Sequence, residues 1–159
     1  MAVGNSSSIP RILTVCLGNI CRSPMAEGVL AHVAELRGVA LDIDSAGTSG
    51  YHIGEAPDRR GQATLRQFGL DISGQRSRQF VTADFDHFDH ILVADQSNKR
   101  DVLALARTEQ DAAKVHLMLH WSTPGAEVPD PYYGGDDGFD HVYTLLVEGC
   151  NAFLDTLHA

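Results

Sequence analysis

The chain has 159 residues, of which 43% are hydrophobic and 21% charged, with a formal net charge of −9. This is room for one globular domain with its own core. The acidic excess argues against a nucleic-acid partner, which needs clustered Lys and Arg. No apolar run approaches the ~18 residues of a membrane span, and residues 1–8 lack a signal-peptide pattern. We expect a flexible extension at 1–8 and one domain at 9–159, in the cytoplasm and with no membrane partner.

The first half of the chain alternates between strand and helix patterns. Residues 12–17 form a short, β-branched apolar run, typical of a strand that is covered on both faces. A helix is predicted to begin at Ser23-Pro24 and to end at Gly38. Residues 41–45 are a second strand candidate, and residues 57–68 form a second predicted helix that Gly69 closes.

The second half repeats the alternation. Strands are predicted at residues 90–94 and 115–119, with a helix at 101–107 between them. Apolar residues at helical spacing predict a long terminal helix over residues 139–157. Alternation of this kind indicates an α/β fold, a parallel sheet with helices on both faces. Such folds bind ligands at the carboxyl ends of their strands, which directs attention to the turn after the first strand.

That turn, residues 16–23, reads Cys-Leu-Gly-Asn-Ile-Cys-Arg-Ser. A strand-to-helix turn directs backbone N–H groups and the positive helix end at one point, which makes an anion cradle. Gly18 and Asn19 tolerate the backbone angles of such a curl, and Arg22 can hold a phosphoryl group with a planar fork. Cys16 in this cradle is expected to be a thiolate nucleophile. The local pattern leaves open a buried cysteine and a capping arginine instead.

Four segments resemble, in the same order, the low-molecular-weight protein-tyrosine phosphatases. They are VCLGNICRSPMAE at 15–27, DSAGTSGY at 44–51, DQSN at 95–98 and DPYYG at 130–134. The resemblance covers the chain from residue 9 onward. It implies a single domain with a four-stranded, doubly wound parallel sheet. It also implies a phosphatase that hydrolyses phosphotyrosine in a protein substrate through a phosphocysteine intermediate, with no metal and no cofactor.

The resemblance also implies roles for the loop residues. Cys16 would attack phosphorus and Arg22 would bind the equatorial oxygens. Asn19, supported by Ser45, would hold the loop in its curled form, and the Ser23 hydroxyl would ease departure of the Cys16 thiolate. Oxyanions such as phosphate or vanadate are expected to bind the same loop. The substrate-binding residues expected from the loop are Leu17, Gly18, Asn19, Ile20, Cys21 and Ser23.

Asp130 is the expected general acid and base. Tyrosine is a leaving group with a pKa near ~10, so its expulsion benefits from a proton donor. An Asp before a Pro is more often a turn residue, and the match to Asp-Pro-Tyr-Tyr-Gly is what favours catalysis. Tyr51 and Tyr132 are expected to form the flat walls of a deep pocket. Tyr133 is a further rim residue, although a surface turn would place it there too, and in the family both tyrosines after the acid can be phosphorylated.

Cys21 is a candidate redox partner for Cys16. The family uses this pair in a reversible disulfide, so peroxide is expected to inactivate the enzyme reversibly; a space-filling role for Cys21 is the alternative. Cys150 falls on the apolar stripe of the last helix and is expected in the core. The eight histidines show no convincing set of three metal ligands. One departure from the family is Gln75, which stands where many members carry a His behind the loop.

Three other functions fit parts of the same pattern. An arsenate reductase of the same fold is excluded, because it needs two further cysteines between Cys21 and Cys150. A protein-arginine phosphatase tends to carry Thr at the position of Ile20, so the larger Ile20 and the paired tyrosines favour an aromatic substrate. A phosphotyrosine-binding or redox-sensing module remains an alternative, and the presence of both Cys16 and Asp130 argues against loss of catalysis.

Overall fold

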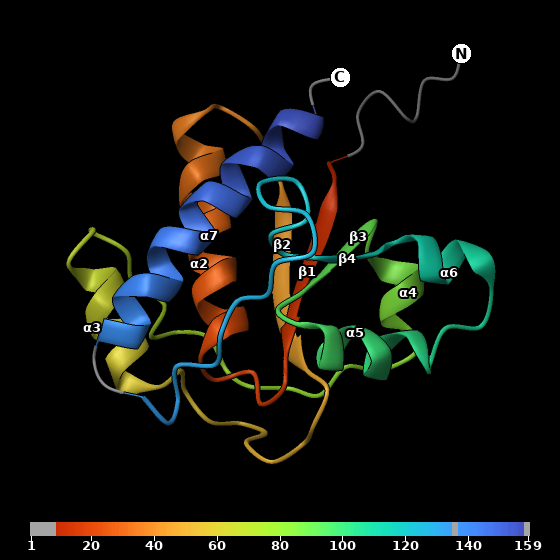
Figure 1. Cartoon of the computed structure of the whole chain (residues 1–159), viewed down its shortest axis with the longest axis horizontal. Coiled ribbons are helices and arrows are strands. Elements are labelled where there is room, and N and C mark those ends of the chain that lie inside the picture. Colours follow the sequence, from red (N-terminus) through yellow and green to blue (C-terminus); the bar gives the residue numbers. More distant parts are fainter. Residues whose placement is uncertain (1–8, 135–136, 158–159) are drawn as a thin grey trace.

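A four-stranded parallel sheet runs through the middle of the computed structural model, which describes residues 9–134 and 137–157 (Figure 1). The predicted extension at 1–8 lies outside the described residues. The strand order is β2-β1-β3-β4. The strands are β1 (Arg11–Cys16), β2 (Asp42–Gly47), β3 (His90–Val93) and β4 (Val115–Leu117).

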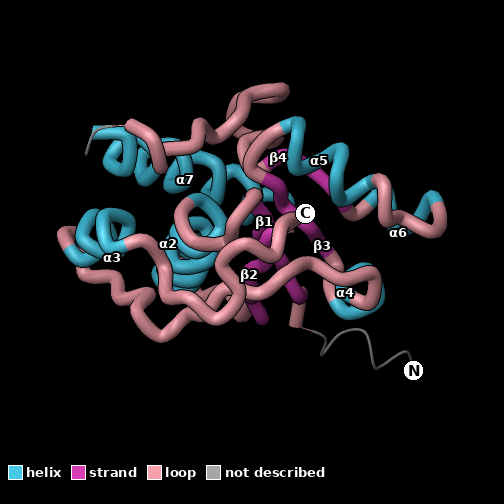
Figure 2. The backbone as a smooth tube through the Cα atoms, turned by 90° about the horizontal axis from the view of Figure 1, so that it is seen from below, coloured by secondary structure: helices cyan, strands magenta, loops and turns pink. Residues whose placement is uncertain are grey.

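Helices cover both faces of the sheet, as the alternating pattern predicts (Figures 1 and 2). One layer is made of α2 (Arg22–Leu36), α3 (Arg59–Arg66) and α7 (Asp137–Thr156). The other contains α4 (Asp84–His87), α5 (Gln96–Leu103) and α6 (Glu109–Ala113). The fold is therefore the doubly wound α/β architecture that the sequence indicates.

The pleat of β1 divides the core into two hydrophobic clusters. Ile12 packs with Phe153 in the cluster beneath α2 and α7, whereas Leu13 and Val15 pack with Phe85 on the opposite face. Each of these five side chains is completely buried. Successive side chains of a strand point to opposite faces, so a central strand with helices on both sides needs the continuous apolar run that the sequence carries.

The carboxyl end of β1 is the point where the winding direction reverses. The chain passes from β1 through α2 to β2 on one side, then crosses to β3 on the other side of β1. The connection after β1 and the connection after β3 turn to opposite sides of the sheet, which opens a crevice at the carboxyl ends of these strands. Figure 2 is seen from below, with the loops at this edge in front of the sheet. The turn with the two cysteines therefore lies where this fold class binds ligands.

The boundaries of several elements differ from the sequence-based prediction. The helix predicted at 101–107 begins at Gln96 and ends at Leu103, because the Asp95 side chain accepts a hydrogen bond from the Asn98 N–H (2.8 Å) and so caps an earlier start. The fourth strand ends at Leu117 rather than at 119. The short helices α4 and α6 were not predicted, since four or five residues are too few to show helical periodicity.

Candidate active site

Asn19 fixes the curl of the loop between β1 and α2. Its backbone adopts a left-handed conformation with φ of 56°, which Asn tolerates better than most residues. Its Nδ2 donates to Ser23 Oγ (2.8 Å) and Ser45 Oγ (3.0 Å), and its Oδ1 accepts from the Arg78 backbone N–H (3.0 Å). Asn19 and Ser23 are both buried and do not line the cavity. Of the residues expected to bind substrate, these two therefore lie behind the loop.

Cys16 ends β1 and lies under the first turn of α2. Its Sγ is 3.1 Å from Ser23 Oγ, so the Ser23 hydroxyl can donate to a thiolate at this position. Residue 16 is followed by the loop and by the N-terminus of a helix of 15 residues. The positive end of that helix favours an anion at the sulfur. The geometry suits a nucleophile and its hydrogen-bond donor.

Arg22 is held in one orientation by the loops that follow β3 and β4. Its Nη1 donates to the Asp95 carboxylate (2.6 Å) and to the Val128 carbonyl (3.0 Å), while its Nη2 lies 3.8 Å from Asp130 Oδ2. Burial alone would lower the pKa of Arg22, but Cys16, Asp95 and Asp130 outweigh burial and raise it. The guanidinium therefore stays charged although it is only 3% exposed.

Asp95 is a site residue that the sequence analysis missed. In the sequence it stands out only as the first residue of the DQSN segment, which by itself indicates no role. Its position at the carboxyl end of β3 was the available signal, because that strand neighbours β1 in the sheet. It orients Arg22 through their ion pair.

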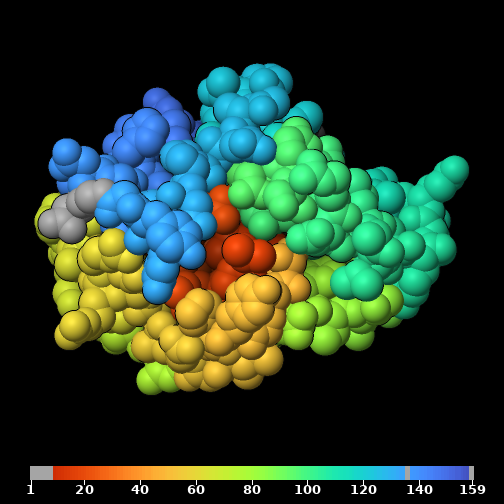
Figure 3. Space-filling model, turned by 60° about the horizontal axis from the view of Figure 1, so that its bottom comes forward, coloured from red at the N-terminus to blue at the C-terminus, as the bar shows by residue number. Residues whose placement is uncertain are grey.

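A cavity of about 320 Å³ opens over Cys16. In Figure 3 the red atoms of the loop after β1 lie at the base of a hollow, between the amber segment near residue 50 and the blue loop near residue 130. The residues that line the cavity are Cys16, Leu17, Gly18, Ile20, Cys21, Arg22, Tyr51, His52, Asp130, Tyr132 and Tyr133. Segments far apart in the sequence thus meet at one hollow.

Asp130 lines the same cavity as Arg22, and their side chains form an ion pair. Its Oδ1 accepts a hydrogen bond from the Tyr132 backbone N–H (3.0 Å), which leaves Oδ2 as the oxygen nearer to Arg22. The carboxylate is 37% exposed, so it can meet a bound substrate. A carboxyl group here can exchange a proton with a group held above Cys16.

The three tyrosines that were expected around the pocket line the cavity and are exposed to solvent. Tyr132 is 39%, Tyr51 78% and Tyr133 90% exposed. Tyr132 and Tyr133 meet edge to face with ring centroids 4.9 Å apart. Aromatic rings free on one face at a cavity mouth suit contact with a flat apolar group.

His52 is a second lining residue that the sequence analysis missed. Its ring packs on the loop, since a Cβ added at Gly18 would lie 3.0 Å from His52 Cδ2. Its Nδ1 is 3.1 Å from Glu55 Oε2, which fixes the ring. The signal was its place directly after Tyr51 in a matching segment. Gly18 therefore leaves room for the His52 ring. Its backbone is not left-handed, so of the two residues expected to take up the unusual angle of the curl, only Asn19 does so.

None of the three cysteines is in a disulfide, and their surroundings differ. Burial raises the pKa of Cys21, and the nearby Asp58 adds to that effect, so Cys21 is held as a thiol. Burial also raises the pKa of Cys150 to about 12, and this side chain packs in the core beside α2 and the sheet. Of the two, only Cys21 lines the cavity with Cys16.

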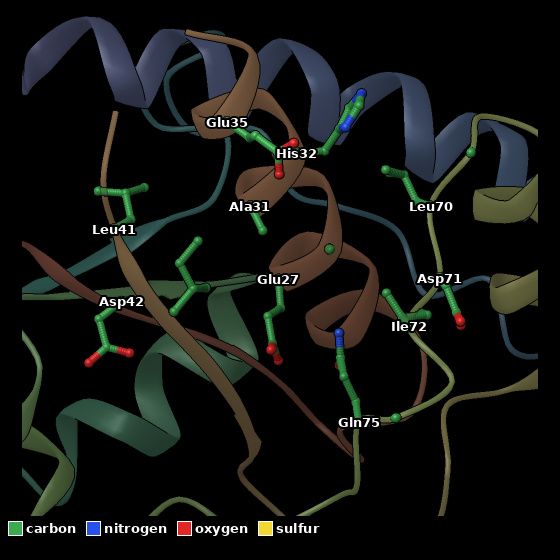
Figure 4. Close-up of a pocket in the computed structure, with 14 residues that line it drawn as sticks. Glu27, Ala31, His32, Glu35, Leu41, Asp42, Leu70, Asp71, Ile72 and Gln75 are labelled. Carbon is green, nitrogen blue, oxygen red and sulfur yellow. The ribbon is translucent and has the colours of Figure 1, made fainter. Parts of the chain in front are cut away.

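A second and wider cavity of about 940 Å³ lies between α2, β2 and the segment 69–75 (Figure 4). Glu27 and Gln75 project into it from α2 and from the loop beneath. Gln75 Nε2 donates to the Pro24 carbonyl (3.1 Å), while its buried Oε1 has no partner among the described residues. None of the described residues that line this cavity is a cysteine or serine. Its relation to the active site runs through Glu27, because Ser45, which supports Asn19 behind the loop, lowers the pKa of the Glu27 carboxyl.

The described residues form neither a metal-binding cluster nor a membrane-spanning helix. Over residues 9–134 and 137–157, no three His, Cys, Asp or Glu side chains converge as a metal ion would require. The pair His116 and His120 has ring centroids 5.1 Å apart, but no third such side chain joins it among the described residues. No helix in the same ranges has both the length and the apolar character to cross a bilayer.

A doubly wound sheet whose first loop presents a cysteine and an arginine, opposite an aspartate, defines a cysteine-dependent phosphatase of α/β type. Comparison with known proteins gives the family. The profile of the "Low molecular weight phosphotyrosine protein phosphatase" family matches residues 11–159. The chain belongs to this family and is a cysteine-dependent hydrolase.

Individual relatives agree with this assignment. The chain is 41% identical to the human low molecular weight phosphotyrosine protein phosphatase over 152 residues, which are 92% of this chain and 95% of the relative. A protein tyrosine phosphatase from Entamoeba histolytica with Hepes in the active site superimposes with a TM-score of 0.88 at 37% identity, covering 94% of this chain and 97% of the other. Drosophila arginine phosphatase is also similar, with a TM-score of 0.85 at 33% identity over 93% of this chain and 98% of the other.

Proposed function

We propose that this enzyme hydrolyses phosphotyrosine in proteins, with Cys16 as nucleophile, Arg22 as phosphate ligand and Asp130 as general acid and base. The observation that carries the proposal is the convergence of these three side chains on one cavity. The family and the human relative favour phosphotyrosine over phosphoarginine. No step needs a metal or cofactor.

In the first half-reaction Cys16 Sγ attacks phosphorus and the bond to the tyrosine oxygen breaks. Asp130, protonated, gives its proton to that oxygen, so the leaving group departs as a neutral phenol. The Arg22 fork and the backbone N–H groups of the loop bind the three equatorial oxygens, where negative charge is concentrated. The products of this step are phosphocysteine, the phenol and an Asp130 carboxylate.

In the second half-reaction a water molecule attacks the phosphocysteine. The Asp130 carboxylate takes a proton from this water, and the sulfur leaves as a thiolate. The Ser23 hydroxyl, 3.1 Å from Sγ, donates a hydrogen bond to the departing thiolate and stabilises it. Inorganic phosphate is released, and Cys16 and Asp130 return to their starting states.

The walls of the cavity support an aromatic substrate. Tyr51 and Tyr132 border the opening, and Leu17 and Ile20 add apolar surface from the loop itself. A phosphate bound at the base must reach Cys16 through this opening, which favours the long, flat phosphotyrosine over the shorter phosphoserine. Tyr133, exposed at the edge, would contact residues that flank the phosphotyrosine.

Reversible oxidation is the second part of the proposal. Peroxide would oxidise the Cys16 thiolate to a sulfenic acid, and the Cys21 thiol would displace water from it to form a disulfide. The position of both side chains on one cavity wall supports this pairing. A disulfide that forms only on oxidation is typical of proteins in a reducing compartment such as the cytoplasm. The odd number of cysteines agrees with this location, because it does not suit a permanent disulfide framework.

The deciding experiment measures initial phosphate release from a phosphotyrosine peptide and from phosphoarginine, with chelator and reductant present. Faster release from the phosphotyrosine peptide is expected. Cys16→Ser should abolish turnover, and a residual rate above about 1% would exclude a cysteine nucleophile. Preference for phosphoarginine would overturn the substrate assignment, and no release from either would favour a binding or redox module.

A further inference from the structure

Arg60 lies at the start of α3 and is anchored there by a carboxylate. Its backbone N–H donates to Asp58 Oδ1 (2.9 Å), and its Nε and Nη2 donate to the two Asp58 oxygens at 3.1 and 3.0 Å. The backbone N–H of Asp58 donates in turn to the Ile20 carbonyl in the phosphate loop (2.8 Å). A two-pronged contact fixes both the plane and the position of a guanidinium. Arg60 is therefore held rigidly relative to the loop that binds phosphate.

The same guanidinium reaches the loop that carries Asp130. Its Nη2 donates to the Tyr132 carbonyl (3.0 Å), and its carbon lies 5.5 Å from the Tyr132 ring centroid and 4.7 Å from that of Phe139. A cation over an aromatic face adds attraction to the hydrogen bond. Among the described residues, this is the one hydrogen bond that the backbone of residues 129–133 makes to another element. Pro129 and Pro131 have no N–H with which to make more.

Tyr132 transmits this restraint to the catalytic carboxylate. Its backbone N–H donates to Asp130 Oδ1 (3.0 Å), and the other oxygen, Oδ2, lies on the side of Arg22. This arrangement holds only while the backbone at Tyr132 stays in place. Three contacts in series thus link α3 to the orientation of the proton donor.

We propose that Arg60 is a positioning residue for proton transfer by Asp130. It holds Tyr132 by its carbonyl and ring, and the Tyr132 N–H then presents Asp130 Oδ2 to the oxygen of the leaving group. Arg60 does not line the cavity, so it acts through Asp130 and not on the substrate. The inference rests on the proposed function, because it concerns the acid of that reaction.

A series of aryl phosphates with different leaving groups tests this role. Esters of acidic phenols need little help from a proton donor, whereas phenols with a pKa near ~10 depend on it. We expect Arg60→Ala to keep kcat/KM, which reports the first half-reaction, within about twofold of the wild type for esters of acidic phenols. For esters of phenols with a pKa near ~10 we expect kcat/KM to fall about 10- to 100-fold. Arg60→Lys should recover part of the loss. Arg59→Ala, at an exposed position of the same helix, is the matched control and should keep the wild-type profile.

The double variant Arg60→Ala/Asp130→Ala separates positioning from a general structural effect. If Arg60 acts through Asp130, its removal costs nothing further once Asp130 is gone. Inhibition by inorganic phosphate and the melting temperature check that each variant keeps a folded loop. If Arg60→Ala melts below the assay temperature, the leaving-group profile of Arg60→Lys is compared with the wild type instead. Lysine keeps the charge but cannot make the two-pronged contact.

Three outcomes contradict the inference. A uniform loss of kcat/KM across leaving groups, or an equal further loss of kcat/KM in the double variant, would show that Arg60 supports the fold and does not position the acid. An unchanged leaving-group profile in Arg60→Ala, with an active wild type, would remove Arg60 from the mechanism and leave the proposed function standing. Failure of the wild type to hydrolyse any aryl phosphate would overturn the proposed function and this inference together.

Discussion

Asn19 combines backbone and side-chain demands in a single residue. Its left-handed backbone turns the loop, while its amide joins Ser23 of α2, Ser45 of β2 and the backbone of Arg78. Glycine would meet the backbone demand at lower cost but could not supply these three hydrogen bonds. The loop is therefore shaped before any anion binds, which reduces the entropy that binding must overcome.

Ser23→Ala tests the assistance given to the leaving thiolate. We expect kcat to fall by about 10- to 100-fold, because a departing anion loses a hydrogen-bond donor. Phosphocysteine should accumulate and be detectable by mass spectrometry after rapid acid quench. Ser97→Ala, at an exposed position of α5, should behave as the wild type. Unchanged turnover in Ser23→Ala would remove the hydroxyl from the second half-reaction.

Glu27, on α2 behind the phosphate loop, makes the stability of the folded protein depend on pH. Burial raises the pKa of its carboxyl from 4.5 to about 7, and the nearby Asp44 adds to this, whereas the hydrogen bond from Ser45 opposes it. The folded protein therefore holds this proton more tightly than the unfolded chain does. The contribution of Glu27 to stability is thus greatest below pH 4.5 and declines as pH rises to about 7.

Glu27→Gln should remove this pH dependence. The wild type should lose about 1–3 kcal/mol of unfolding free energy between pH 5 and pH 8 as Glu27 ionises, and Glu27→Gln should not show this loss. Urea unfolding at the two pH values measures the difference. Glu35→Gln, at an exposed position of the same helix, is the control and should show no such change. If Glu27→Gln differs from the wild type by the same amount at both pH values, Glu27 does not titrate in this window.

At the scale of elements, α7 packs directly onto the backbone that follows β4. A Cβ at Gly149 would lie 2.8 Å from Leu119 Cδ2 and 2.9 Å from the Met118 carbonyl oxygen. Both distances are shorter than real contacts allow, and the carbonyl cannot rotate away as a side chain could. Gly149 thus sets how closely the last helix approaches the sheet.

Gly149→Ala should destabilise the protein by about 1–3 kcal/mol, because overpacking forces the helix away from the sheet. The free energy of unfolding from urea titration measures this. Gly74→Ala is the matched control, since a Cβ there meets nothing within 4 Å, and it should change stability by less than about 0.5 kcal/mol. A neutral Gly149→Ala would mean that α7 can shift outward without loss of packing.

At the scale of the whole molecule, the winding of the sheet assembles the active site. Cys16 is the last residue of β1 and Arg22 the first of α2, while Asp95 follows β3 and Asp130 lies beyond β4. All four strands are parallel, so their carboxyl ends share one edge. The site is thus a property of the folded molecule, and an anion that bridges its loops should stabilise the fold.

Inorganic phosphate should therefore raise the melting temperature in a saturable manner. At about 100 times its Kd, phosphate adds about 2.7 kcal/mol of stability by mass action. A thermal melt in phosphate against chloride at equal ionic strength measures this. Cys16→Ser should retain the effect, because the backbone N–H groups and Arg22 remain. Equal melting temperatures in both salts would exclude an anion site at the loop.

Much of this enzyme follows from local sequence. The strand at Ile12, the helix start at Pro24 and the curl at Asn19 each follow from residue types and spacing over fewer than about 20 positions. The start of α5 was misplaced, because Asp95 was not interpreted as a helix cap. The role of Asp130 came from the resemblance to a family, since an Asp before a Pro by itself indicates only a turn.

The sequence by itself determined the alternation of strands and helices and the strand-to-helix turn, and it indicated Cys16 as the candidate nucleophile. Only the tertiary structure decided that Asp95 orients Arg22, that His52 packs on Gly18 and that Arg60 reaches the acid loop. The reason is physical. Patterns along a chain encode periodicity and backbone preference, which are local, whereas an ion pair between residues 22 and 95 exists only after parallel strands bring their ends to one edge.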